Sequence, residues 1–192
     1  MNKDAESRKL AIEALKEAPP VILFRRPIEY ILADHFRHRT LCNLLGEIAD
    51  ESDQDQEKIE VVLHFLQTDF RTHVADEEED LFPLLLQRAT REDGMDDVLR
   101  ELSQDHVRDA KQAGRIIKQL SARLSATVGA PSSPDESKLL RQFARHEKHH
   151  LTLENAIVLP LARARLTSGD QRNLGKHMAS RRGLAYPDDQ TA

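Results

Sequence analysis

Apolar residues recur along this chain at the three-to-four-residue spacing that is typical of amphipathic α-helices. The pattern predicts four long helices, at about residues 27–50, 56–87, 96–124 and 135–165. Polar or Gly/Pro-containing segments separate them, and shorter helices are expected at about 5–17 and 170–181. We therefore predict an all-α fold, an up-down-up-down four-helix bundle with short extra N- and C-terminal helical segments.

The same pattern suggests three parts within the 192 residues. An N-terminal segment covers residues 1–26, and the bundle covers 27–166. A C-terminal helix with a loose tail takes up 167–192.

Composition narrows the classes of protein that fit. The net charge is −5, and no basic stripe is interleaved with aromatic residues, so we expect no nucleic-acid partner. No apolar run approaches the roughly 20 residues that a membrane helix needs, and the charged N-terminus does not look like a secretion signal. Cys42 is the single cysteine and cannot form an internal disulfide. We expect a cytoplasmic protein, with a homodimer left open.

Two of the predicted helices carry the same motif, His-x-x-x-Glu, as His73/Glu77 and His150/Glu154. Residues four apart share one face of a helix, and in both cases that face also carries Leu, Ile and Phe. A proline follows each histidine by ten residues, Pro83 in one helix and Pro160 in the other, and we expect each to kink or end its helix. The repeat indicates two helical hairpins of one design.

The first and third helices add one inward histidine each, His35 and His106. Two buried carboxylates that face each other require a compensating cation, and no Lys or Arg occupies the inward stripe at that level. Four imidazoles and the carboxylates of Glu77 and Glu154 are too many ligands for one tetrahedral zinc. They suit two metal ions that share both carboxylates. A single histidine on an apolar face is more often a core residue, and only the repeated pattern favours metal binding.

These residues, together with the stretch from Asp76 to Pro83, resemble the hemerythrin-like (HHE cation-binding) family over roughly residues 27–165. The resemblance implies a non-haem di-iron centre with oxo- or hydroxo-bridged and carboxylate-bridged irons. The bridging carboxylates would be Glu77 and Glu154. One iron would take His35 and His73, and the other His106 and His150. The sequence leaves zinc or manganese open as the loaded metal.

The chain departs from the oxygen-carrying members of that family. They place a second histidine four residues after the third-helix histidine, where this chain has Ala110, and they use an Asp at +5 where this chain has Glu154 at +4. We therefore favour a protein that senses or handles oxygen, nitric oxide or iron in a stress response. Alternatives are a di-iron enzyme (peroxidase, oxidase or nitric-oxide-consuming) and an iron donor for iron–sulfur cluster repair. A purely structural bundle is a third class. The expected small ligands are oxygen, nitric oxide and peroxide.

A few further polar residues have several interpretations. His146 and His38 are candidates for additional ligands or for residues just outside the ligand set. Asp34 and Asp105 are placed to accept the second ring N–H of a neighbouring ligand histidine. Glu78 reads mainly as part of a solvated acidic face, with a shifted ligand as the alternative.

Overall fold

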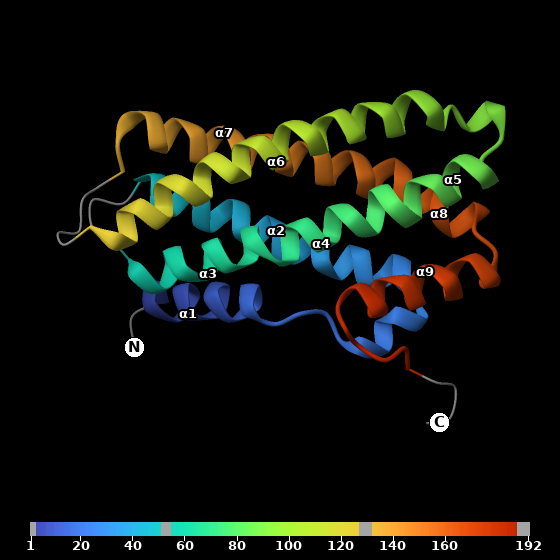
Figure 1. Cartoon of the computed structure of the whole chain (residues 1–192), viewed down its shortest axis with the longest axis horizontal. Helices are drawn as coiled ribbons and strands as arrows, with labels where there is room; N and C mark the ends of the chain where they lie inside the picture. Colours follow the sequence, from blue (N-terminus) through green and yellow to red (C-terminus); the bar gives the residue numbers. More distant parts are fainter. Residues whose placement is uncertain (1–2, 51–54, 127–131, 188–192) are drawn as a thin grey trace. The chain divides into compact units, whose positions relative to one another are not determined.

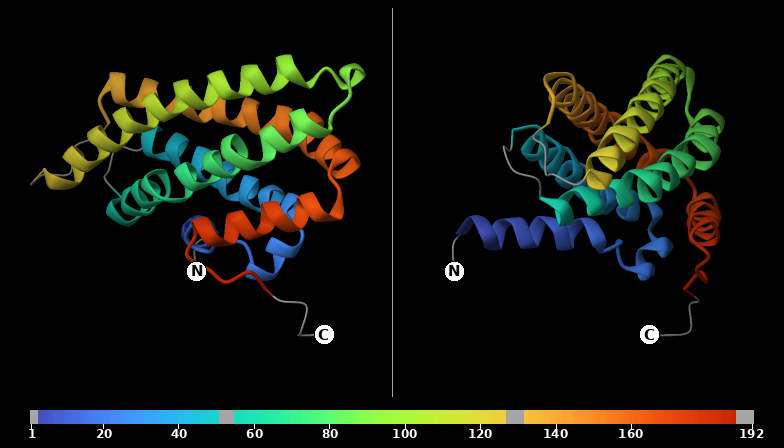
Figure 2. Two further views of the ribbon diagram at one scale, coloured as in Figure 1. Left: turned by 45° about the vertical axis from the view of Figure 1, so that its right-hand side comes forward. Right: turned by 60° about the vertical axis from the view of Figure 1, so that its left-hand side comes forward.

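The computed structural model describes residues 3–50, 55–126 and 132–187, and these residues form helices and connecting turns with no strand among them. In chain order the elements are α1 (Lys3–Lys16), η1 (Val21–Arg25), α2 (Pro27–Asp50), α3 (Gln56–Gln67), α4 (Asp69–Asp76), η2 (Glu77–Leu81), α5 (Phe82–Arg88), η3 (Arg91–Asp93), α6 (Met95–Ser125), α7 (Pro134–Leu153), η4 (Glu154–Val158), α8 (Leu159–Arg165) and α9 (Ser168–Arg181). Figures 1 and 2 follow them by colour. The predicted all-α, four-helix fold is confirmed. The two short helices are also present, as α1 and α9.

The helix bounds agree closely with the periodicity of the sequence. The first long helix begins at Pro27, a residue suited to a first helical turn, and it ends at Asp50 as predicted. The third lies within one residue of its predicted limits. The second run, predicted as one helix, is interrupted at Thr68, whose hydroxyl and backbone N–H both donate to the carbonyl of His64. Parts of the two long predicted loops, residues 51–54 and 129–131, lie outside the described residues.

The two prolines do not end their helices, so that part of our expectation was wrong. Neither helical run ends at Pro83 or Pro160; each continues to Arg88 or Arg165. A wider π-helical turn precedes each proline instead, in η2 and η4. Proline has no N–H and its ring crowds the carbonyl four residues earlier, and an extra residue in the preceding turn relieves both problems. Each π turn begins at one of the two motif glutamates, Glu77 or Glu154.

The described chain separates into two compact units, and each contains segments from all four long helical runs. The first unit comprises residues 1–18, 36–71 and 107–150. In it α1 packs on α3, where Arg8 pairs with Asp55 and Glu57. The second unit comprises residues 19–35, 72–106 and 151–192.

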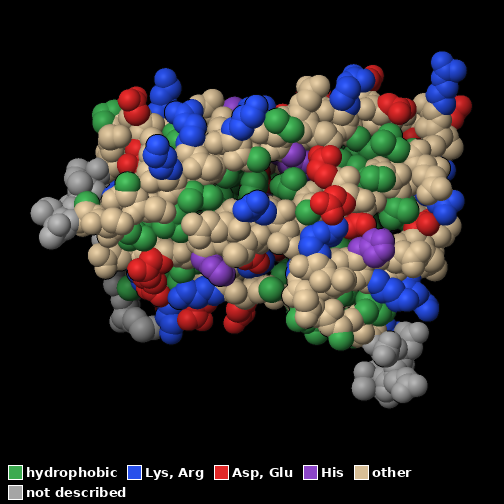
Figure 3. All heavy atoms as spheres, viewed as in Figure 1, with side chains coloured by type: hydrophobic (Ala, Val, Ile, Leu, Met, Phe, Trp, Pro, Cys, Tyr) green, Lys and Arg blue, Asp and Glu red, His purple; other side chains and the backbone are tan. Residues whose placement is uncertain are grey.

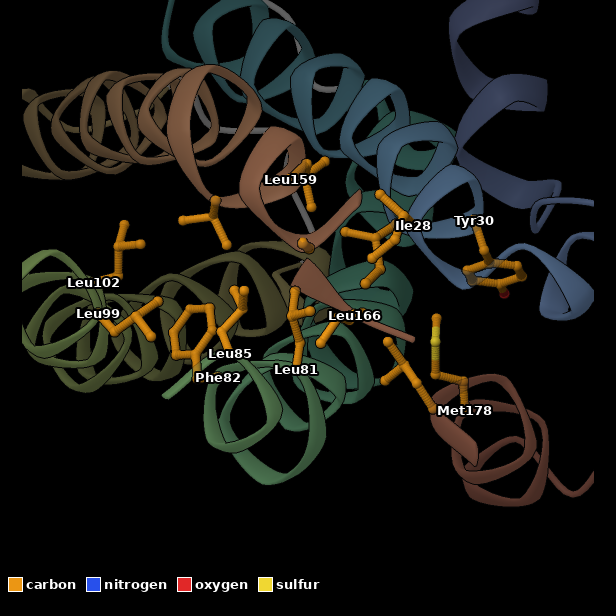
Figure 4. Packing of buried hydrophobic residues seen from close by; sticks show 14 of the residues in the cluster. Ile28, Tyr30, Leu81, Phe82, Leu85, Leu99, Leu102, Leu159, Leu166 and Met178 are labelled. Atoms are coloured by element: carbon orange, nitrogen blue, oxygen red, sulfur yellow. The ribbon is translucent and has the colours of Figure 1, made fainter. Parts of the chain in front are cut away.

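The second unit has its own apolar core. Figure 4 shows labelled members of this core from α2, η2, α5, α6, α8 and α9 and from the residue after α8: Ile28, Tyr30, Leu81, Phe82, Leu85, Leu99, Leu102, Leu159, Leu166 and Met178. All of them are at most 6% exposed. Each fully buried aliphatic side chain stabilises the fold by roughly 1.5–3 kcal/mol. This apolar core therefore stabilises the helices that carry the polar residues of the site.

The charged surface and the helices agree with the class of protein that the composition indicates. On the face shown in Figure 3, acidic and basic side chains are interspersed. None of the described helices combines the length and the apolar character that crossing a bilayer requires.

Candidate metal centre

Two glutamates form the centre of the polar site in the second unit. Glu77 is the first residue of η2 and Glu154 the first residue of η4, and neither side chain is exposed to solvent. A carboxylate that is buried so completely requires positive charge or several donors close by. Neither π turn supplies a cation of its own.

Histidines from three helices point their Nε2 atoms at these carboxylates. His73, one turn before Glu77, places Nε2 3.3 Å from Glu77 Oε1. His35 of α2 lies 3.6 Å from the same oxygen and 3.5 Å from Glu154 Oε2. His106 of α6 approaches the other oxygen of Glu77, with Nε2 3.3 Å from Oε2. All five of these residues were predicted from the sequence, and the fold brings them together.

The spacing fits ligands of a shared cation better than it fits hydrogen bonds. One ligand atom each from His35, His73, Glu77 and Glu154 lie within 4.8 Å of one another, and the same holds for Glu77, His106 and Glu154. Two ligands that are each ~2.1 Å from one metal ion are separated by at most ~4.2 Å, which accommodates separations of 3.3 to 3.6 Å. His35 Nε2 and both oxygens of Glu77 are buried without a hydrogen-bond partner among the described residues. Imidazole nitrogen with carboxylate oxygen is a donor set that suits iron, zinc or manganese.

The other ring nitrogen of each histidine is held by an oxygen acceptor. His73 Nδ1 lies 3.2 Å from Asp34, His106 Nδ1 2.6 Å from Glu78, and His35 Nδ1 2.9 Å from Asn155 Oδ1. Such partners fix the ring and leave Nε2 as the lone-pair donor, as in most metal-ligating histidines.

These acceptors only partly match the sequence analysis. Asp34 makes the predicted contact with a neighbouring histidine, His73, while the corresponding contact of Asp105 stays a prediction. The Glu78 side chain is 33% exposed and lies 2.6 Å from His106 Nδ1, so Glu78 itself is more than part of a solvated acidic face. Asn155 was missed, although one signal was available, because Glu78 and Asn155 each directly follow a motif glutamate.

In the metal-free chain, protons on the histidines compensate the negative charge of the carboxylates. Burial favours the neutral form of Glu77, but His73, His106 and His35 hold its pKa well below the usual range. Burial likewise opposes the charged form of His73, yet Glu77 and Asp34 raise its pKa to about 10. His106 behaves in the same way, with Glu77 and Glu78 raising its pKa to about 10 against the effect of burial. This cluster of carboxylates therefore demands cationic charge, which protons on the imidazoles or a metal ion can supply.

The remaining candidate histidines belong to the first unit. His150 is its last residue, is 2% exposed, and lies four residues before Glu154 on a continuous helical run, so the two side chains share a face. His38 is buried, with Nδ1 2.6 Å from Glu147 Oε1 and its ring edge-on to Phe65. His146 is half-buried on α7.

Comparisons with known proteins agree with this geometry. A family model described as the hemerythrin HHE cation binding domain matches residues 26–162. No curated protein matches the chain. The matched segment contains every histidine and glutamate of the site described above.

Proposed function

Because the chain belongs to the hemerythrin family of HHE cation-binding domains, we propose that it holds two metal ions, iron in the cell, and uses them to sense or handle oxygen, nitric oxide or iron. The proposed ligands are His35, His73, Glu77, His106, His150 and Glu154. His38 and His146 are proposed to lie outside the ligand set, since neither is among the residues whose ligand atoms gather around Glu77 and Glu154.

One observation carries the proposal. Nε2 atoms from three helices converge on two buried carboxylates, and an oxygen acceptor fixes each ring from behind. A core that merely tolerates histidines has no need for this orientation, because the same side chains would be better satisfied with direct hydrogen bonds.

The arrangement around Glu77 supports two ions rather than one. His73 and His35 approach Oε1, whereas His106 approaches Oε2. A carboxylate that offers one oxygen to each set of imidazoles is suited to bridging two metals. This division matches the pairing that the family resemblance implies, with His35 and His73 on one ion. We propose His150 as the partner of His106 on the other, as the family resemblance implies.

The side chains themselves prepare the site for a small ligand. Iron held by these residues would supply a site for a small ligand and a change of oxidation state. The protein excludes bulk water from the site, since His35, His73 and His106 are at most 6% exposed. Asp34, Glu78 and Asn155 keep the imidazoles from rotating, so that little reorganisation is needed when a ligand enters. A sensing or handling role needs no further catalytic group.

Metal analysis together with optical spectroscopy tests the proposal. Protein made in iron-replete cells should contain about two irons per chain and absorb in the near ultraviolet, and nitric oxide or oxygen should change that spectrum reversibly. Stoichiometric zinc with no response to either gas would contradict the proposed role while leaving cation binding in place. Continuous consumption of peroxide or nitric oxide would instead favour the di-iron enzyme.

A further inference from the structure

The π turn that begins at Glu77 overlaps a run of five consecutive carboxylates, Asp76 to Asp80. Glu77 faces the imidazoles, and Glu78 accepts hydrogen bonds from His106 and Ser103. The three other carboxylates face α9. So many like charges in one turn repel one another, and the turn keeps its shape only if cations on its outer side offset that repulsion.

Arg181, the last residue of α9, supplies much of that charge. Its guanidinium pairs with Asp76, donates to Asp80 Oδ2 at 2.7 Å, and donates to Glu79 Oε2 at 3.0 Å. Asp76 is only 1% exposed, whereas the Glu79 side chain is 68% exposed, so the contacts with Asp76 and Asp80 matter most.

Arg182 makes the second connection. Its Nη2 lies 2.6 Å from Asp76 Oδ2, and its guanidinium stacks over the rings of Tyr30, at 4.9 Å, and Phe24, at 5.9 Å. Asp76 thus receives two guanidinium groups and directly precedes Glu77 in the chain. A planar guanidinium that packs against an aromatic ring fixes the direction of the contact as well as its charge.

The opposite end of α9 is anchored separately. Thr167 and Asp170 form a capping box, and Arg88 donates to both oxygens of Asp170 at 2.8 and 2.9 Å. His177, in the middle of the helix, lies 2.6 Å from Asp80. The helix therefore has one anchor that does not touch the π turn and one that holds the turn directly. In Figure 3, acidic, basic and histidine side chains gather where the π turn and α9 meet.

We propose that Arg181 and Arg182 are positioning residues of the metal centre: through Asp76 and Asp80 they hold the π turn so that both oxygens of Glu77 face the imidazoles. The inference rests on the proposed metal-binding function. It goes beyond the family assignment, because α9 begins at Ser168, after the matched residues 26–162. It also gives a role to the Arg181–Arg182 pair, which the chain's composition alone does not explain.

Metal titration of the full chain tests the proposal with Arg181→Ala and Arg182→Ala. We expect ferrous iron affinity, measured in competition with a chromophoric chelator, to fall by ~10-fold or more, as it does when outer partners of metal ligands are lost. The spectrum of the loaded protein should shift as well. In metal-free protein, hydrogen–deuterium exchange should speed up at residues 77–81 and remain unchanged at 154–158.

Arg88→Ala is the matched control, because it removes an arginine ion pair of α9 without touching the π turn. It should lower the thermal stability while leaving the iron affinity and the spectrum unchanged. Arg181→Lys keeps the charge but not the planar fork, so it should restore the affinity only in part. If an alanine variant does not fold, Asp80→Asn removes the negative charge that Arg181 and His177 contact without changing the shape of the side chain, and the same loss of affinity is expected.

Equal affinity and equal exchange in the arginine variants and in Arg88→Ala would overturn the positioning role. Failure of the wild-type chain to bind metal would overturn the proposed function instead. The exchange measurement on metal-free protein would still decide whether the two arginines hold the turn.

Discussion

Glu78 Oε1 lies 2.6 Å from Nδ1 of His106, and this contact gives one histidine of the site an anionic partner. Asn155 holds the equivalent place after the other motif glutamate and offers a neutral amide oxygen to His35. The two residues that follow the motif glutamates therefore differ in the charge that they place behind an imidazole. A carboxylate behind an imidazole makes that ring a stronger electron donor to a metal than an amide does.

This difference predicts opposite effects for two shape-preserving substitutions. Glu78→Gln should raise the reduction potential of the iron-loaded site, because His106 becomes a weaker donor. Asn155→Asp should lower it, because His35 gains an anionic partner. Spectroelectrochemical titration measures both potentials. Shifts of the same sign in the two variants would contradict the prediction that Glu78 and Asn155 differ in their effect on the histidines that they contact.

The raised pKa values of His73 and His106 predict how pH affects the metal-free protein. Both imidazoles have a folded-state pKa of about 10, against ~6.5 for an unperturbed histidine. Their protonated forms therefore contribute stability that is fully present below pH ~6.5 and is lost as the pH rises toward 10. Metal binding requires neutral imidazoles, so the metal-loaded form gains stability relative to the metal-free form as the pH rises over the same range. The fall in melting temperature on adding a chelator should be larger at pH ~8.5 than at pH ~6.

A fall of equal size at both pH values would show that these two histidines do not exchange protons for metal. Calorimetry of the same protein, with and without chelator, measures both differences. A chelator that has no effect at either pH would favour the structural reading of the histidines.

The close packing of α9 on η1 predicts that one glycine cannot be replaced. A Cβ at Gly175 would overlap the carbonyl oxygen of Phe24, which is backbone and cannot turn aside. Gly175→Ala should destabilise the fold by about 1–3 kcal/mol, as overpacking does. Gly114 lies in α6 with nothing within 4 Å of its added Cβ, so Gly114→Ala should stabilise by about 0.5–1 kcal/mol. Urea titration of both variants gives the two signs, and a stable Gly175→Ala would contradict the packing.

His38 separates structural histidines from the proposed ligands. Its Nδ1 is buried against Glu147, so His38→Ala leaves a carboxylate without this partner in the interior of the first unit. We expect a loss of about 3 kcal/mol in unfolding free energy, with the metal content unchanged. Loss of one metal ion from a folded His38→Ala protein, measured by elemental analysis, would instead make His38 a ligand.

The helices could be predicted because the apolar residues that indicate them recur at a regular spacing. Apolar residues at helical spacing placed α2 and α6 almost to the residue, and the four-residue spacing of His73 and Glu77 placed both on one inward face. The acceptors behind the imidazoles were less accessible. Each π turn adds a residue to the helical repeat, so the direction of Glu78 or Asn155 does not follow from a period of 3.6.

The contacts of α9 were out of reach for another reason. They join residues about a hundred positions apart, such as Arg181 and Asp80, and depend on how tightly two helical backbones approach. Periodicity along the chain carries no information about that distance.

The most direct test of a shared, carboxylate-bridged centre is ferrous iron uptake by the wild type and by the double variant Glu77→Ala/Glu154→Ala. Elemental analysis after anaerobic loading and desalting should give about two irons per wild-type chain. It should give far less for the double variant, with the helical circular dichroism retained. A wild-type chain that takes up far less than two irons, or a double variant that binds as much as the wild type, would contradict the account.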